Sequence, residues 1–157
     1  MVVLGVDPGF TVTGFSVVSK VHGRDVIVDS GYFSLPTGLS LQVRIGIFYD
    51  FLHEKIKIYN VTVLSIETPF LGKNVQSFLK LGYLRGVLYL LAQQNGLALK
   101  EFSPREVKQA ITGFGGAQKD QVAKVLSMIF PQLQKPKKED VTDAIAIGLC
   151  GLWIKTL

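Results

Sequence analysis

Cysteine is nearly absent from this sequence, which contains only Cys150 among its 157 residues. One cysteine cannot form an internal disulfide, and there is no Cys/His cluster with zinc-ligand spacing, so we expect a chain of a reducing compartment, the cytoplasm. No stretch of about 18 uninterrupted apolar residues occurs. No basic segment precedes the apolar run after Met1 either. We therefore expect neither a membrane span nor a signal peptide.

Internal repeats, low-complexity segments and an interdomain linker are also missing. A chain of 157 residues with 48% hydrophobic residues is the size of one domain and can bury a core without disulfides or structural metal. We predict a single domain over residues 1–157.

Positive charge, in contrast, is concentrated in one part of the chain. Residues 73–138 contain eleven Lys or Arg and three acids, a formal charge of +8, whereas the remainder sums to −3. A strongly basic half suits a polyanionic partner such as nucleic acid, because lysine and arginine that neutralise phosphates release counterions. A solubilising surface would show the same charge, so charge alone leaves both interpretations open.

The hydrophobic pattern predicts an α/β fold with a mixed sheet. Alternating and β-branched runs predict five strands, and apolar residues repeating at about 3.6 positions predict helices between and after them. The first three strands have the short connections of an antiparallel meander, and the later strands alternate with helices, which should flank the sheet. The expected strands cover residues 2–7, 13–19, 25–33, 61–67 and 97–102. The expected helices cover residues 39–58, 75–94, 104–111, 119–130 and 139–154.

Two predicted strands end in an acidic residue. Asp7 follows an apolar strand and precedes Pro8-Gly9, and Glu67 follows a β-branched run that ends at Thr68-Pro69. If the first and fourth strands are parallel, their carboxyl ends lie at one edge of the sheet. Asp before Pro-Gly is also ordinary turn chemistry. Glu67 at the rim of the core is partly dehydrated and needs a partner or a cation.

Two more acids begin the last predicted helix. Asp140 and Asp143 are three residues apart, which puts them on nearly the same helix face. Acids in a first helical turn can simply complement the helix dipole. Four carboxylates at one edge, however, would repel each other unless divalent cations bound between them. Two such ions can activate water and stabilise the leaving oxygen in phosphodiester hydrolysis.

An ordered set of motifs along nearly the whole chain resembles the bacterial Holliday junction resolvases of the RuvC family, within the ribonuclease H-like superfamily. Asp-Pro-Gly alone is a weak signal, but the ordered set is specific. The landmarks include Gly5-Val6-Asp7-Pro8-Gly9, Ile66-Glu67, Leu79-Lys80-Leu81-Gly82 with Arg85-Gly86, Ser103-Pro104 and Asp143-Ala144-Ile145-Ala146.

The resemblance implies a homodimeric endonuclease that nicks two strands of a four-way DNA junction during recombination and repair. It implies that Asp7, Glu67, Asp140 and Asp143 jointly bind two Mg²⁺ ions, which Mn²⁺ could replace. Phe70 would stack on an unpaired base. The implied DNA-binding cations are Lys73, Lys80, Arg105, Lys108 and Lys119. Helix 75–94, with Gly82 and Gly86, would form the dimer contact, and the RuvA and RuvB motor would be a partner.

This chain departs from the family pattern at three positions. Gln118 stands where an acid commonly precedes the lysine, and Val141 and Thr142 stand where small residues are common. We expect all three differences to leave activity in place. Two alternatives are a ribonuclease H-like nuclease acting on structured RNA precursors and a junction-binding module without activity. The paired Asp140 and Asp143 favour the resolvase over the former, and the four intact acids disfavour the latter.

Overall fold

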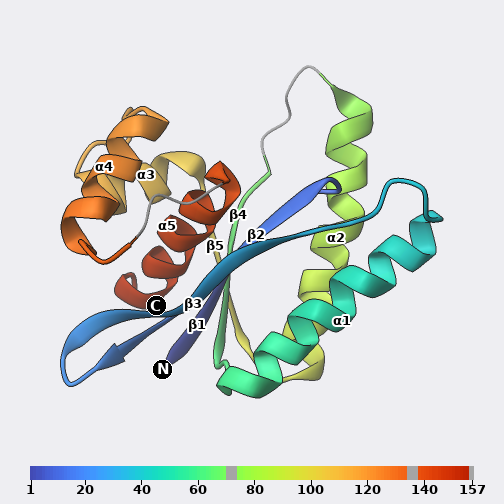
Figure 1. The fold of residues 1–157 in the computed structure, drawn as a ribbon, viewed down its shortest axis with the longest axis horizontal. Helices are drawn as coiled ribbons and strands as arrows, with labels where there is room; N and C mark the ends of the chain where they lie inside the picture. The colour runs from blue at the N-terminus through green and yellow to red at the C-terminus, as the bar shows by residue number, and fades with distance from the viewer. Residues whose placement is uncertain (70–73, 134–137, 156–157) are drawn as a thin grey trace.

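One β-sheet lies between two groups of helices, as Figure 1 shows. The computed structural model describes residues 1–69, 74–133 and 138–155. The sheet has the strand order β3-β2-β1-β4-β5. Its strands are β1 (Val2–Asp7), β2 (Val12–Val21), β3 (Arg24–Ser34), β4 (Val63–Glu67) and β5 (Ala98–Phe102). β1, β2 and β3 pair antiparallel, whereas β4 runs parallel to both β1 and β5, which confirms the predicted mixed sheet.

The helices cover the two faces unequally. α1 (Leu41–Tyr59) and α2 (Val75–Gln94) lie on one face, and α5 (Glu139–Trp153) crosses the other (Figure 1). α3 (Pro104–Thr112) and α4 (Lys119–Ile129) pack mainly against each other and α5. α5 is therefore the helix that meets the centre of the sheet on its face.

Alternation along the central strands divides the core into two halves. In β1, Val3 belongs to the cluster on the α5 side, whereas Leu4 belongs to the cluster under α1 and α2. In β4, Val63 and Leu64 divide in the same way. Successive side chains of a strand point to opposite faces, so a strand that is apolar throughout is covered on both.

The element boundaries agree with the predicted ones to within two residues, and those of β1 and α2 are the same as predicted. The hairpin of β2 and β3 is longer than predicted, because His22 and Gly23, both with positive φ, form a tight two-residue turn that lets pairing continue to Val21 and Arg24. β4 begins at Val63, not 61, because the Val61 N–H donates to Ile56 O at the end of α1. The Leu97 N–H likewise still bonds α2, at Ala92 O. The other differences are frayed helix ends.

Glycine and serine let α5 approach the sheet very closely. A Cβ on Gly5 of β1 would lie 2.5 Å from both the Ala144 oxygen and the Gly148 nitrogen of α5. Two buried serines of the sheet reinforce the contact: Ser16 Oγ donates to the Ala144 carbonyl and Ser65 Oγ to the Ile147 carbonyl, both at 2.7 Å. The backbones of helix and sheet thus meet almost directly.

Cys150 of α5 is fully buried, and its thiol faces the main-chain oxygen of Val107 in α3. Burial raises the pKa of its thiol to about 12. The thiol is therefore protonated at ordinary pH and unreactive. Among the described residues, no helix combines the length and the apolar character needed to cross a membrane.

Replacing Gly5 by alanine should destabilise the protein by about 1–3 kcal/mol, the usual cost of overpacking a core. The added methyl would meet main-chain atoms of α5, which cannot rotate away. The matched control is Gly46→Ala in α1, where an added Cβ meets no atom within 4 Å. That change should be neutral or stabilising by up to about 1 kcal/mol. Urea unfolding of both variants measures the difference, and equal stabilities would contradict the close packing.

Candidate active site

Asp7 and Glu67 lie at the same edge of the sheet because their strands are parallel neighbours. The register pairs Val6 of β1 with Ile66 of β4, and each acid is the next residue and the last of its strand. Both strands are buried up to that point. The core therefore holds the two carboxylates at its rim, as the sequence predicted.

α5 adds the other two acids from its first turns. Asp7 pairs across the sheet with Gly14 of β2, and a Cβ on Gly14 would overlap the main-chain oxygen of Asp140. The missing side chain of Gly14 therefore lets the start of α5 lie against the end of β1. Asp143, three residues further on, is half-buried on the helix face that meets the same strand end.

The acids and two lysines surround one cleft of about 310 Å³. Apolar side chains of α3, α4 and α5 form its floor and walls, which removes water from one side of the charged groups. The charged residues of its lining are Asp7, Glu67, Lys108, Lys119 and Asp143. Asp140 lies near enough for its charge to raise the pKa of Asp7.

Burial and mutual repulsion make this cluster electrostatically unfavourable. The pKa of Asp7 rises from 3.8 to about 7, first because the carboxylate is dehydrated and then because Asp143, Asp140 and Glu67 repel its charge. Burial is also the main reason that the pKa of Glu67 is raised, and Asp143 adds to it. Lysines oppose the shift only in part. A cation placed among the acids would relieve both effects.

Lys119 and Lys108 line the cleft together with Asp7, Glu67 and Asp143. Lys119 Nζ donates to Asp143 Oδ2 at 3.0 Å, and this bond is the main reason that the lysine pKa is raised. Lys108 projects from α3 into the cleft, where its charge lowers the pKa of Glu67. Both lysines were selected from the sequence by resemblance alone, and both line the cleft with the acids.

The other predicted DNA-binding residues lie outside the cleft or outside the described part of the chain. Arg105 is exposed on α3, where its side chain packs over Gly115 in the loop before α4. Lys80 is exposed on α2. Phe70 and Lys73 fall outside the described residues. The DNA-binding roles of all four stay predictions.

The donor set suits a divalent metal ion by its chemistry. Within residues 1–69, 74–133 and 138–155, no three Asp, Glu, His or Cys side chains stand close enough together to hold a metal as placed. Asp143 is turned to Lys119 instead. Hard oxygen donors such as carboxylates are those that Mg²⁺ and Mn²⁺ prefer. The residues present therefore fit such an ion.

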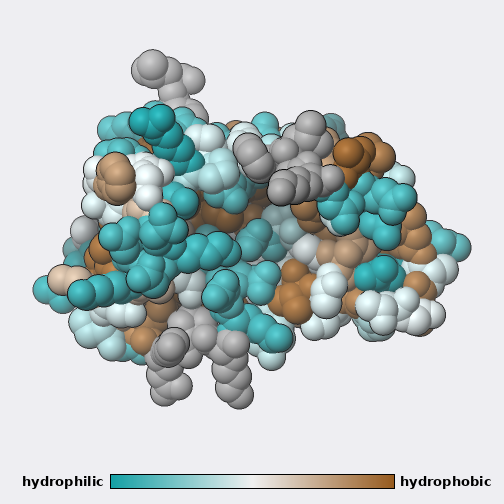
Figure 2. Space-filling view, turned by 90° about the horizontal axis from the view of Figure 1, so that it is seen from above, coloured by the Kyte–Doolittle hydropathy of each residue, from teal (hydrophilic) through white to brown (hydrophobic). Residues whose placement is uncertain are grey.

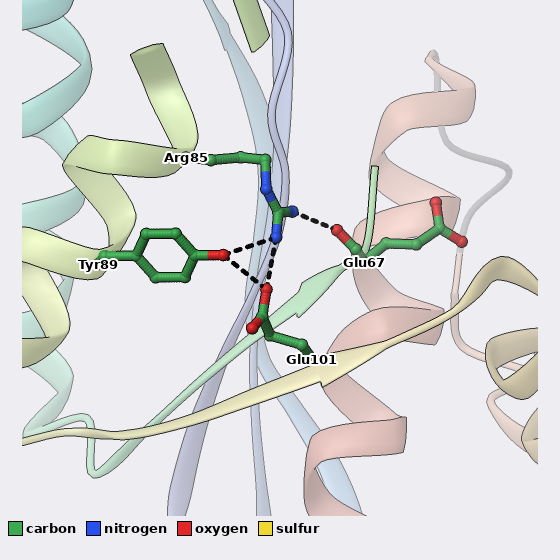
Figure 3. A network of polar contacts seen from close by, with 4 residues as sticks. All are labelled: Glu67, Arg85, Tyr89 and Glu101. Carbon is green, nitrogen blue, oxygen red and sulfur yellow. Dashed lines mark hydrogen bonds and ion pairs between the residues drawn. The ribbon is translucent and has the colours of Figure 1, made fainter. Parts of the chain in front are cut away.

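Sequence reasoning gave no role to Arg85, which lies directly behind Glu67. Arg85 is buried on α2 and donates from Nη1 to the main-chain oxygen of Glu67 (Figure 3). Its Nη2 binds Glu101 of β5 and Tyr89 of α2. The available signal was one arginine in an apolar helix, four residues before a tyrosine, because a buried arginine needs partners.

The chain matches the model of a known protein family. The family model described as crossover junction endodeoxyribonuclease RuvC matches residues 3–151. The chain is 45% identical over 154 residues to the crossover junction endodeoxyribonuclease RuvC of Chlorobium phaeovibrioides, an alignment that covers 97% of this chain and 81% of the relative. It is 35% identical over 153 residues to the protein of that name from Caldicellulosiruptor saccharolyticus, covering 97% and 92%.

A solved structure gives the same relationship. The Thermus thermophilus RuvC in complex with a Holliday junction substrate superposes with a TM-score of 0.87 at 27% identity. The match covers 95% of this chain and 91% of that chain. The five-stranded sheet and its flanking helices are therefore the ribonuclease H-like arrangement that the sequence predicted.

Asp7→Asn should raise the unfolding temperature of the metal-free protein near pH 8, and this gain should disappear towards about pH 4. The pKa of Asp7 is raised in the folded state, so folded protein binds the proton more tightly than unfolded protein. Stability therefore falls as pH rises from about 4 to about 7 and stays low above it. Asparagine does not ionise. Each kcal/mol corresponds to roughly 2–4 °C in a domain of this size.

Thermal unfolding in EDTA across this pH range makes the measurement. The control is Asp50→Asn, which removes an exposed carboxylate on α1. If the difference in unfolding temperature between Asp7→Asn and wild type did not change with pH, the pKa of Asp7 would not be raised in the folded protein.

Proposed function

Because the chain belongs to the crossover junction endodeoxyribonuclease RuvC family, we propose that it resolves four-way DNA junctions by metal-dependent nicking of two strands. The observation that carries the proposal is the meeting of acids from β1, β4 and α5 at one cleft. These acids are far apart in the chain, and their negative charges repel one another in the fold. A bound cation would explain why the fold places them together.

The proposed catalytic and metal-binding residues are Asp7, Glu67, Asp140 and Asp143. Two Mg²⁺ ions, or Mn²⁺ in their place, would supply an activated water and a positive charge on the leaving oxygen. The protein contributes rigidity, because three of the acids stand at the ends of elements that are buried behind them. It also keeps water from the apolar walls of the cleft, which strengthens the electrostatic interactions inside.

Lys108 and Lys119 are proposed to bind the phosphate that is cut. Both line the cleft, Lys108 from α3 and Lys119 from α4. In the absence of other cations Lys119 is held by Asp143. An ion that took over Asp143 would free the ammonium of Lys119 for a phosphate oxygen, where it stabilises the charge that develops during hydrolysis.

The charge of residues 73–138 supports a DNA substrate. The two cleft lysines belong to this +8 segment, as do the exposed Lys80 and Arg105. Phosphate contacts from such residues supply affinity that does not depend on base sequence, so junction shape would govern where the protein binds. We assign Phe70 and Lys73 to contacts near the junction centre by family resemblance alone.

The exposed face of α2 is proposed to bind a second copy of the chain. Apolar side chains recur on it at about one-turn intervals, with Leu79 57% and Tyr83 51% exposed, and Val75 and Leu90 continue the row. A Cβ added to Gly82 or Gly86 meets no atom within 4 Å, so a partner helix could approach closely there. Figure 2 shows the larger hydrophobic patches on the half that holds α1 and α2. A twofold dimer would give two sites for two strands.

The remaining assignments follow from the family. We propose that the RuvA and RuvB complex is the partner that delivers the junction, that the protein acts in the cytoplasm, and that residues 1–157 form a single nuclease domain.

Asp7→Asn should abolish nicking of a synthetic four-way junction in Mg²⁺ or Mn²⁺ and leave junction binding intact. The loss should exceed about 100-fold, because even groups that only support metal ligands contribute 10- to 100-fold. Asp120→Asn is the control, since Asp120 is an exposed acid beside Lys119. Linear duplex and structured RNA are tested in parallel. Efficient cutting of RNA but not of the junction would favour an RNA-processing nuclease instead.

Leu79→Glu should convert the dimer into a monomer, because the introduced charge would be buried without a partner at the centre of the α2 face. Sedimentation equilibrium of wild type and variant measures this. Val43→Glu, at a comparably exposed apolar position on α1, should leave the mass unchanged. If Val43→Glu disrupts the dimer and Leu79→Glu does not, the dimer interface lies on α1 and the proposal is wrong.

A further inference from the structure

We propose that Arg85 is a positioning residue for Glu67: by binding the Glu67 main-chain oxygen and the Glu101 carboxylate together, it fixes the end of β4 so that the Glu67 carboxylate faces the cleft. This inference rests on the proposed function only in taking Glu67 as a metal ligand. Figure 3 shows the four residues involved.

The contacts of Arg85 form a closed network. Arg85 is 7% exposed and approaches β4 from α2, on the sheet face opposite α5. Nη1 donates to the Glu67 carbonyl, while Nη2 donates to Glu101 Oε1 and, at 3.0 Å, to Tyr89 Oη. Tyr89 Oη donates in turn to Glu101 Oε1 at 2.8 Å. Each member therefore restrains the other two, and the planar guanidinium has a single orientation that satisfies them all.

The bonded carbonyl lies where the sheet ends. Pairing of β1 with β4 stops at Val6 and Ile66, one residue before Glu67. On the β5 side, the last bond is from Thr68 N–H to the Phe102 oxygen, at 2.8 Å. Pro69, which follows, has no N–H to donate. Arg85 thus binds the main chain of β4 at Glu67, whose side chain lines the cleft and after which the strand pairing ends.

Glu101 keeps the charge of Arg85 away from the Glu67 carboxylate. In Figure 3 the Glu67 side chain points away from Arg85 and towards α5, so only its main chain is bonded. The cations that lower the pKa of Glu67 are Lys119 and Lys108. An arginine paired with that carboxylate would compete with a metal ion for the same oxygens. Because Glu101 occupies Arg85, the carboxylate of Glu67 stays available.

The test measures Mn²⁺ binding by calorimetry, without DNA, for wild type and Arg85→Met. Methionine fills similar space but donates no hydrogen bond. We expect about 10-fold weaker Mn²⁺ binding, as for other groups that orient metal ligands. The Mn²⁺ concentration for half-maximal junction nicking should rise by the same factor, while junction affinity in EDTA should stay within about 2-fold, because Arg85 is buried.

The matched control is Lys100→Met. Lys100 is also a buried cation bonded to main-chain oxygens, those of Gly151 and Ile154 at the end of α5, remote from Glu67. Its loss should lower stability without changing Mn²⁺ affinity. Equal Mn²⁺ affinities of Arg85→Met and wild type would overturn the inference. So would an equal loss of affinity in Lys100→Met, since this would be a general effect of stability.

Arg85→Lys and Glu101→Gln cover the case in which Arg85→Met does not fold. Lysine cannot bind both partners with fork geometry, and glutamine leaves the Arg85 charge free to turn to Glu67. Both should weaken Mn²⁺ binding, by less than Arg85→Met would, and wild-type affinity in both would overturn the proposal. If wild type binds Mn²⁺ but does not cut junctions, the proposed function fails while the role of Arg85 is still decided.

Discussion

The close contact between α5 and the sheet is the constraint on which the acid cluster depends. Ordinary side chains at Gly5 and Gly148 would hold the helix further out. Asp140 and Asp143 would then no longer reach the ends of β1 and β4. Ser16 and Ser65 fill the remaining space and bond the helix backbone, so the approach is held by hydrogen bonds as well as by the absence of side chains. Small residues in the core thus determine the geometry of charged residues at its rim.

The same packing makes the site unfavourable until a cation binds. Asp7 is dehydrated by the core that positions it, and its neighbours raise its pKa further. Lys119 offsets part of this repulsion through Asp143. The scaffold therefore holds negative charges close together at the cleft, and a cation bound among them would relieve their repulsion. α5 restrains the end of the sheet from one face. From the other face, Arg85 of α2 restrains it through its hydrogen bonds to Glu67 and Glu101.

Much of this arrangement could be predicted from sequence because it depends on local patterns. Period-two and continuous apolar runs located the strands, and parallel pairing of the first and fourth then put Asp7 and Glu67 at one edge. The approach of α5 could not be derived, because it depends on which glycines face one another across the core. Arg85 was recognised only as a landmark of the resemblance and received no role, because a backbone carbonyl, its partner at Glu67, has no sequence signature. Lys108 was found only by resemblance, since exposed lysines look alike in a sequence.

Cys150 has a practical consequence for experiments on this protein. Its thiol is enclosed between α5 and the helices beside it and stays protonated at ordinary pH. A cysteine introduced at an exposed position would thus be the one thiol that a maleimide dye modifies in the folded chain. Fluorophores or spin labels can be attached at chosen positions without first removing the native cysteine, which would leave a cavity in the core.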